Sequence, residues 1–234
     1  MRLLGVLGGM SWTSTETYYR LLNTGVAGRL GGHHSARLLL HSVDFAPVAD
    51  LQHAGDWDAA AEILAEAARG LRAAGAQSLL LATNTMHKVA DAVEHAAGVP
   101  LIHIADATAA AVRAAGLHRV GLLATAFTME DGFLVDRLAA GGVEAVVPDA
   151  AGRAEVHRII YDELVLDVVR PESREVYRDV MADLVADGVE AMLLGCTEIS
   201  LLVGEHDTTV PVFDSTALHA AAGVDWLVGR AERG

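Results

Sequence analysis

Two short segments of this chain each end an apolar run in a residue that could exchange a proton. In one segment a leucine run reaches Ala82 and Thr83, and in the other a similar run reaches Gly195 and Cys196. Such runs are typical of buried strands whose carboxyl ends open onto a cleft. Two such ends facing each other would place two proton-exchanging groups on opposite sides of one substrate. That arrangement suits removal of a proton from one face of a carbon and its return to the other.

Polar residues follow both strand ends. Asn84 and Thr85 come after Thr83, and Thr197 comes after Cys196. At helix N-termini they would offer N–H and side-chain donors to a carboxylate or an enediolate-like oxygen. A thiol has a reference pKa of about 8.5, and a helix N-terminus lowers it, so we expect a usable Cys196 thiolate at neutral pH. A threonine hydroxyl is a far weaker acid, so we expect Cys196 to take a proton and Thr83 to deliver or relay one.

Each of these residues also has a purely structural interpretation. A lone buried cysteine is usually an inert small hydrophobe, and a threonine after a strand is often a helix cap. His87 could tune a neighbouring group or simply pack on a helix face. The remaining histidines lack the spacing of a metal site, so we expect no metal. The glycines after the first apolar run lack the dinucleotide-binding spacing, and a tight turn under a small substrate fits them better.

The elements that must position these residues alternate between strand and helix. Strands are expected at residues 3–7, 37–43, 78–82, 101–104, 120–124, 143–147, 191–194 and 210–213. Helices are expected at residues 16–30, 56–74, 87–97, 128–139, 154–166, 172–187 and 216–228. The first helix opens on a candidate capping box, Thr13 to Glu16. This alternation favours an α/β fold with parallel sheets covered on both faces.

A weak internal repeat suggests two halves of the same design. A strand ending at Gly8 precedes Thr83, and a strand ending at Ala124 precedes Cys196 at a similar distance along the chain. We therefore expect two similar Rossmann-like domains related by a pseudo-twofold axis, with the active site in the cleft between them. The first domain comprises residues 1–112 plus 209–234, and the second comprises residues 113–208.

Composition and charge narrow the classes of function. The chain has 234 residues, a net charge of −14, 52% hydrophobic residues and a single cysteine. The negative charge disfavours a nucleic-acid groove or an anionic membrane surface as partner. No apolar run is long enough for a transmembrane helix, and the apolar N-terminus fits a strand better than a signal segment. One cysteine fits a reducing cytosol, so we expect a cytoplasmic protein.

In this order and spacing, the motifs of the chain resemble those of the aspartate/glutamate racemase family nearly end to end. They are Gly8-Gly9-Met10-Ser11-Trp12, Tyr18-Tyr19 with Asn23, His41-Ser42-Val43-Asp44-Phe45, Gln52, Thr83-Asn84-Thr85-Met86-His87, His103-Ile104-Ala105-Asp106-Ala107-Thr108, Ile160-Tyr161-Asp162-Glu163-Leu164, Gly195-Cys196-Thr197-Glu198-Ile199 and Pro211-Val212-Phe213-Asp214. The resemblance implies a cofactor-independent enzyme with one acid/base residue at each of two strand tips. Most members carry cysteine at both tips, and Thr83 is a departure shared by a branch that acts on L-aspartate and L-glutamate.

The resemblance also implies roles for further residues. Cys196 would face the Cα–H of the L-enantiomer, Met10 and Gln52 would line the pocket beside Asn84 and Thr85, and Glu163 would meet the α-ammonium group. Some relatives place basic residues near the positions of Gln52 and Glu163, and this chain does not. The group that binds the second carboxylate of the substrate is therefore open. A homodimer is expected from the family.

Two other interpretations remain open at this stage. The same cleft could serve another carbanion reaction, such as hydantoin racemisation, maleate isomerisation or arylmalonate decarboxylation. The chain could also be a binding module for amino acids that lost turnover with its first cysteine. Exchange of the α-proton of L-glutamate or L-aspartate in D₂O separates an enzyme from a binder.

Overall fold

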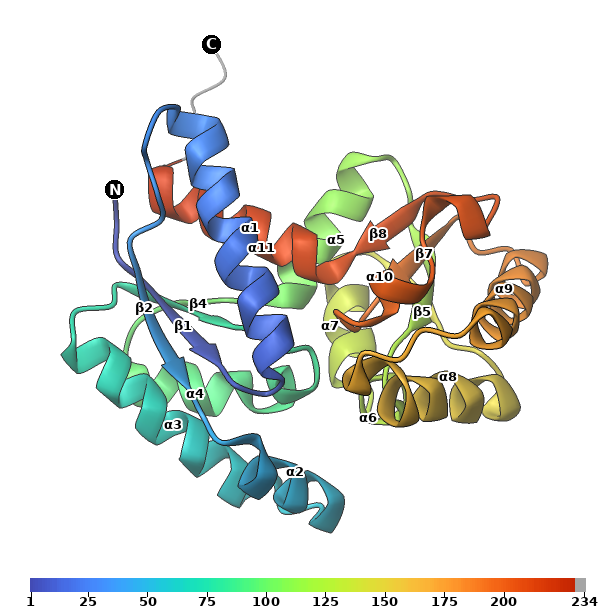
Figure 1. The fold of residues 1–234 in the computed structure, drawn as a ribbon, viewed down its shortest axis with the longest axis horizontal. Helices are drawn as coiled ribbons and strands as arrows, with labels where there is room; N and C mark the ends of the chain where they lie inside the picture. Colours follow the sequence, from blue (N-terminus) through green and yellow to red (C-terminus); the bar gives the residue numbers. More distant parts are fainter. Residues whose placement is uncertain (230–234) are drawn as a thin grey trace. The chain divides into compact units, whose positions relative to one another are not determined.

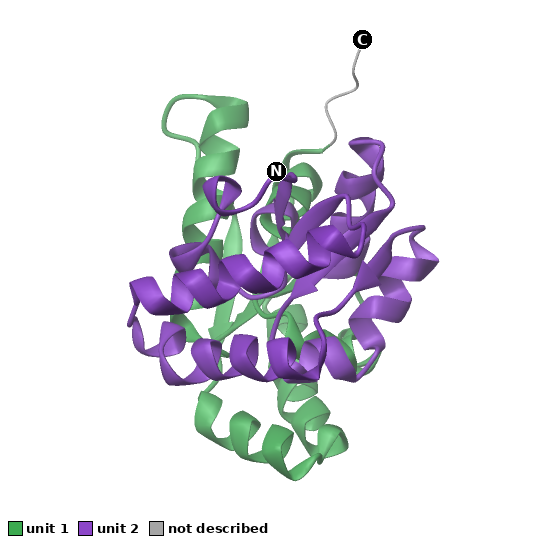
Figure 2. Ribbon diagram, turned by 90° about the vertical axis from the view of Figure 1, so that its right-hand side faces the viewer, with its two compact units in different colours: residues 1–103, 219–234 green, residues 104–218 purple. Residues whose placement is uncertain are grey.

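The computed structural model describes residues 1–229, which form two compact units (Figure 2). The first unit is Met1–His103 together with residues 219–229, and the second is Ile104–Leu218. The chain therefore crosses between the units twice. Residues 230–234, which the sequence assigns to the first domain, lie outside the described residues.

The two crossings differ from the boundaries expected after residues 112 and 208. Strand β8 (Val212–Asp214) pairs with β7 (Ala191–Leu194), so it belongs to the second unit. Helix α5 (Ile104–Ala114) also lies in that unit, because Asp106 accepts two hydrogen bonds of 2.8 Å from Arg137. Tertiary pairing of this kind is invisible in the strand–helix alternation of the sequence.

The first unit is built on a four-stranded parallel sheet in the order β2-β1-β3-β4 (Figure 1). Its strands are β1 (Leu4–Gly8), β2 (Leu38–Ser42), β3 (Ser78–Leu81) and β4 (Leu101–Ile102). Its helices are α1 (Trp12–Leu30), α2 (Phe45–Ala54), α3 (Trp57–Ala73), α4 (Ala90–Ala97) and most of α11 (Ser215–Val228), with a 3₁₀ turn at Thr85–Val89.

Helices cover both faces of this sheet, as the buried strands predict. Along β3, Leu79 and Leu81 pack toward the α2, α3 and α4 layer, whereas Leu80 packs with residues of α1 and α11. The alternation of the side chains along the strand thus joins two separate apolar layers across one sheet.

The second unit repeats this design with the order β6-β5-β7-β8. Its remaining strands are β5 (Arg119–Leu123) and β6 (Glu144–Val146). Its helices, besides α5, are α6 (Ala126–Glu130), α7 (Phe133–Ala140), α8 (Ala150–Asp162), α9 (Pro171–Ala186) and α10 (Ile199–Leu202), with 3₁₀ turns at Leu164–Leu166 and Glu205–Asp207. The shared strand order confirms the two-part α/β fold and the repeat expected from the sequence.

Several helices differ from the expected ones for identifiable reasons. Helix α1 begins at Trp12 because Ser11, ahead of the expected capping box, caps it. The expected helix 128–139 is divided near Gly132, whose φ of 76° ends one turn and starts the next. Helix α2 is not among the expected helices, and its Pro47 lies in the first turn, where a missing N–H is tolerated.

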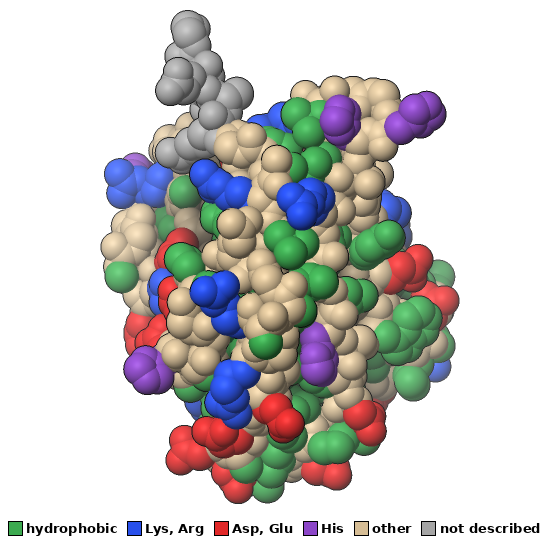
Figure 3. Space-filling model, turned by 90° about the vertical axis from the view of Figure 1, so that its left-hand side faces the viewer, with side chains coloured by type: hydrophobic (Ala, Val, Ile, Leu, Met, Phe, Trp, Pro, Cys, Tyr) green, Lys and Arg blue, Asp and Glu red, His purple; other side chains and the backbone are tan. Residues whose placement is uncertain are grey.

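The surface of the described chain carries mixed charges. On the face shown in Figure 3, Asp and Glu side chains gather toward the lower edge, while Lys and Arg lie among small and apolar side chains. The five charged residues of α3, Asp58, Glu62, Glu66, Arg69 and Arg72, are all exposed. Within residues 1–229, no helix has the length and apolarity needed to cross a membrane.

Candidate active site

A tight glycine turn follows β1 at the carboxyl edge of the first sheet. Gly9 has a φ of 95°, and a Cβ there would lie 2.2 Å from the carbonyl oxygen of Val43. The N–H of Gly9 donates to Oγ1 of Thr15 at 2.8 Å. The turn therefore requires glycine and brings the backbone close to the neighbouring strand end.

The two candidate catalytic residues occupy equivalent places in the two units. The N–H of Ala82 donates to the carbonyl of Leu7, and the N–H of Gly195 donates to the carbonyl of Leu123, both at 2.8 Å. Thr83 and Cys196 are the next residues in each case. In each sheet they therefore lie at the end of a central strand, at the switch in strand order where open α/β sheets bind ligands.

The first unit groups five of the residues expected at the substrate. Thr83 and Thr85 are partly exposed, whereas Asn84, Met10 and Gln52 are buried. Nε2 of Gln52 lies 2.9 Å from Sδ of Met86, so α2 is attached to the segment that follows β3. The structure thus brings Gln52 to the β3 end.

The second unit places a carboxylate directly at the candidate thiol. Sγ of Cys196 donates to Oε2 of Glu198 at 2.9 Å, and Oγ1 of Thr197 donates to the same oxygen at 2.6 Å. Glu198 is buried, and Cys196 is partly exposed. One carboxylate oxygen therefore accepts two hydrogen bonds from the residues of the β7 end.

This environment corrects the expectation of a pre-formed thiolate. Burial and the negative charge of Glu198 raise the pKa of Cys196 well above its usual value, and Asp214 acts in the same direction. Helix α10 has four residues and begins only at Ile199, so the dipole expected to stabilise the thiolate is small. The resting group is a thiol that already points its proton at a carboxylate.

Other titratable groups surround this strand end. Burial raises the pKa of Tyr161, and the proximity of Cys196 and Glu198 adds to the shift. Burial likewise raises the pKa of Tyr177 well above its usual value, with further contributions from Cys196 and Glu163. Both phenols are thus neutral and lie close enough to sense the thiol.

Glu163 is buried and already bound on both carboxylate oxygens. Oε2 accepts from Oγ of Ser173 at 2.5 Å, and Oε1 accepts from Arg158 at 3.0 Å. The hydrogen bond from Ser173, followed by that from Arg158, lowers the pKa of Glu163. Each oxygen keeps a second lone pair, so a substrate ammonium group would share this carboxylate with Ser173 and Arg158.

Glu198 is a candidate functional residue that the sequence reasoning missed. It appears there only as a letter in the Gly195–Ile199 motif, with no role. The available signal was an acid two residues after a candidate nucleophile, on the same strand-to-helix turn. His157 also reaches a strand end that the sequence reasoning did not consider: its Nδ1 accepts from the N–H of Ala126 at 3.2 Å, shortly after β5.

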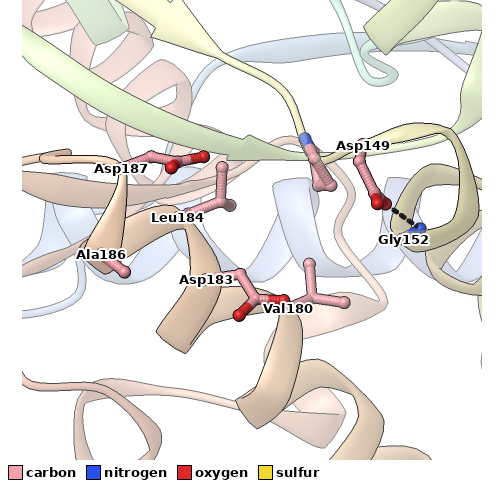
Figure 4. A pocket seen from close by; sticks show the side chains of 8 residues that line it. Asp149, Gly152, Val180, Asp183, Leu184, Ala186 and Asp187 are labelled. Atoms are coloured by element: carbon pink, nitrogen blue, oxygen red, sulfur yellow. Dashed lines mark hydrogen bonds between the residues drawn. The ribbon is translucent and has the colours of Figure 1, made fainter.

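A separate hollow of about 300 Å³ lies in the second unit, away from the β7 end. Its lining includes the carboxylates of Asp149, Asp183 and Asp187, as Figure 4 shows. Oδ1 of Asp149 is already bonded to the N–H of Gly152 at 2.7 Å. Three carboxylates would repel an acidic ligand, so this hollow is a poor site for one. In the described part of the chain, no group of three His, Cys, Asp or Glu side chains could hold a metal ion.

Comparison with known protein families assigns this chain to one of them. The sequence profile of the Asp/Glu/hydantoin racemase family matches residues 7–223. The chain belongs to this family.

Solved structures of this racemase family agree with the assignment. A candidate Asp/Glu racemase from Yersinia pestis is 50% identical, with 97% of this chain and 100% of that chain covered and a TM-score of 0.93. An aspartate racemase homologue from Pyrococcus horikoshii OT3 is 31% identical, with 97% and 100% covered and a TM-score of 0.84. An aspartate racemase from Picrophilus torridus, 22% identical over 100% and 97% of the two chains with a TM-score of 0.77, shares the fold.

Proposed function

We propose that this protein racemises L-aspartate or L-glutamate without a cofactor, with Cys196 and Thr83 exchanging the α-proton on opposite faces of the substrate. The equivalence of the two strand ends, fixed by the same hydrogen bond in both units, carries the proposal. Family membership supports a racemase, and the names of the solved relatives support acidic amino acids.

The first step of this reaction needs a base, and the resting thiol is not one. In the proposal, Glu198 accepts the Sγ proton along the existing 2.9 Å hydrogen bond, and the resulting thiolate takes the Cα proton of the L-enantiomer. Local donors must then stabilise the carbanion. Asn84 and Thr85 are the proposed donors to the substrate carboxylates, and Thr197 joins them when its hydroxyl turns from Glu198 toward the substrate.

The second step returns a proton to the opposite face. Thr83 gives its hydroxyl proton to the carbanion while it takes another from solvent. The proton left on Glu198 is released to solvent, and Cys196 has regained its thiol from the substrate. Each cycle therefore returns the enzyme to its starting state. Met10 and Gln52 are proposed to shape the pocket, and Glu163 is proposed as the acidic group nearest the α-ammonium.

Proton exchange in D₂O, followed by NMR with L-aspartate and L-glutamate, tests the proposal. We expect Cys196→Ala to abolish exchange of the α-proton, because the variant lacks the proposed base. Thr83→Ala should retain exchange and suppress the D-product, because Thr83 is needed only to complete inversion. Full racemisation by Cys196→Ala would contradict these roles.

The setting of the enzyme forms a smaller part of the proposal. A single cysteine supports a cytoplasmic location, and the family supports a homodimer. Light scattering coupled to size-exclusion chromatography measures the mass of the assembly directly.

A further inference from the structure

Three histidines lie buried together in the first unit, behind the strand end that carries Thr83. His87, His103 and His219 are each at most 5% exposed. The ring centroids of His87 and His103 are 4.6 Å apart, and those of His87 and His219 are 5.3 Å apart. The proposed proton transfers use none of these rings.

The hydrogen bonds of this cluster lead to the β3 end. Nδ1 of His87 lies 2.7 Å from the carbonyl oxygen of Thr83, and Nε2 of His219 lies 2.7 Å from the carbonyl oxygen of Ile102. Because a carbonyl only accepts, both ring nitrogens must carry hydrogen. In a neutral ring Nδ1 of His219 then accepts from the hydroxyl of Tyr18, which is 2.9 Å away.

The positions of these histidines along the chain are as informative as their contacts. His103 is the last residue of the first unit before the chain crosses to the second, and His219 is the first residue after it returns. Both therefore mark the crossings, and both contact the ring of His87. His87 in turn holds the backbone of Thr83.

We propose that His87, His103 and His219 form a buried connector that fixes the Thr83 carbonyl relative to both points where the chain crosses between the units. They are positioning residues, since they act on the reaction only through Thr83. A displacement at either crossing then reaches the β3 end through the ring of His87. The importance of this for catalysis rests on the proposed role of Thr83, but the connector itself can be tested without substrate.

Hydrogen exchange measured by mass spectrometry on residues 82–89 tests the connector directly. His219→Phe keeps a ring but removes both hydrogen bonds, so we expect the segment to exchange about tenfold faster, by local opening. His87→Phe should have the same effect. Residues 82–89 of the double variant should exchange no faster than those of either single variant, because each variant interrupts the same chain of contacts between His219, His87 and Thr83. Unchanged exchange in His219→Phe would overturn the proposal.

Val26→Ala is the matched control. Val26 is buried in the same apolar layer between α1 and α11 but belongs to no part of the connector. It should destabilise the unit without selective opening of residues 82–89. Equal opening in this control and in His219→Phe would mean that the histidines serve only to fill the core.

Two further measurements keep the proposal testable if a variant fails to fold or lacks activity. Nitrogen NMR of the wild-type protein should show hydrogen on Nδ1 of His87 and on Nε2 of His219, and the opposite tautomers would refute the connector.

In the D₂O assay, His219→Phe should lower D-product formation about tenfold, since small displacements of a catalytic group lower the rate by up to about a hundredfold. Exchange of the L-substrate should stay within about twofold of wild type. Normal D-product formation despite an opened segment would remove the connector from catalysis, whereas a wild-type enzyme without any exchange would refute the proposed function instead.

Discussion

The thiol of Cys196 donates its proton to a carboxylate two residues further along the same turn. The negative charge of Glu198 opposes a free thiolate, and its oxygen offers a place for the proton. Both effects come from one side chain, so in the proposed mechanism the thiolate forms as Glu198 takes the proton. Replacing Glu198 therefore separates reactivity of the thiol from catalysis.

We expect Glu198→Gln to change the thiol and the reaction in opposite directions. The pKa of Cys196 should fall, because the nearby negative charge is gone. Racemisation should fall by about a hundredfold, the lower range for loss of a general base. Ultraviolet absorbance of the thiolate across pH gives the first quantity, and rates of D-product formation give the second.

Glu205→Gln is the matched control for this experiment, because Glu205 is exposed in the same unit. It should leave both the thiol titration and the rate unchanged. A Glu198→Gln enzyme that racemises at the wild-type rate would remove Glu198 from the mechanism.

At the scale of the elements, the helix α11 is attached to the sheet through His219. Burial lowers the pKa of His219 to about 4. The side chains that face this ring are Tyr18, His87 and His103, so no carboxylate among them could stabilise a charged ring. Below about pH 6.5 the unfolded chain binds a proton at this position and the folded chain does not, so stability decreases as the pH falls.

The stability of the wild-type protein should accordingly fall faster with acid than that of His219→Gln. Between about pH 7.5 and about pH 5 the extra loss should be about 2 kcal/mol. Urea unfolding of both proteins at several pH values measures this difference. Parallel loss of stability in the two proteins would show that His219 is protonated equally in the folded and unfolded states.

Element by element, strand periodicity was the most reliable signal in the sequence. The buried runs at β3 and β7 lie where expected, because parallel strands covered on both faces are continuously apolar. The β1 turn was also predictable from its paired glycines. Helix α2 was not, since Pro47 carries the same local signal in a loop and in a first turn.

Within the site, residue types were predictable but their electrostatic state was not. Cys196 and Thr83 follow apolar runs, which can be recognised directly in the sequence. The pKa of Cys196 depends on how deeply the thiol is buried and on the approach of Glu198 and Asp214, and Asp214 comes from a different strand. The connector likewise joins residues far apart in the chain, so no local pattern could reveal it.

For the whole molecule, thermodynamics limits how one-sided the reaction can be. Two enantiomers have equal free energy in water, so kcat/KM must be equal in the two directions. We expect a larger kcat from the L-enantiomer, because its proton faces Cys196, together with a proportionally larger KM. The D-enantiomer should bind tightly, turn over slowly and inhibit the L reaction.

Initial rates from each enantiomer over a full concentration range decide this point. Unequal values of kcat/KM in one enzyme preparation would mean that the reaction is not a simple racemisation. Equal values of kcat/KM together with equal kcat from the two enantiomers would mean that Thr83 transfers the α-proton as effectively as the thiol does.

Because the chain contains a single cysteine, the proposed catalytic thiol is also its only site for a thiol-directed label. One alkyl adduct per chain in an intact mass spectrum would therefore count the working centres of a preparation without any substrate. A fluorophore attached there would report from the β7 end alone, with no background from other thiols. The single thiol thus allows the proposed active sites of a preparation to be counted by labelling.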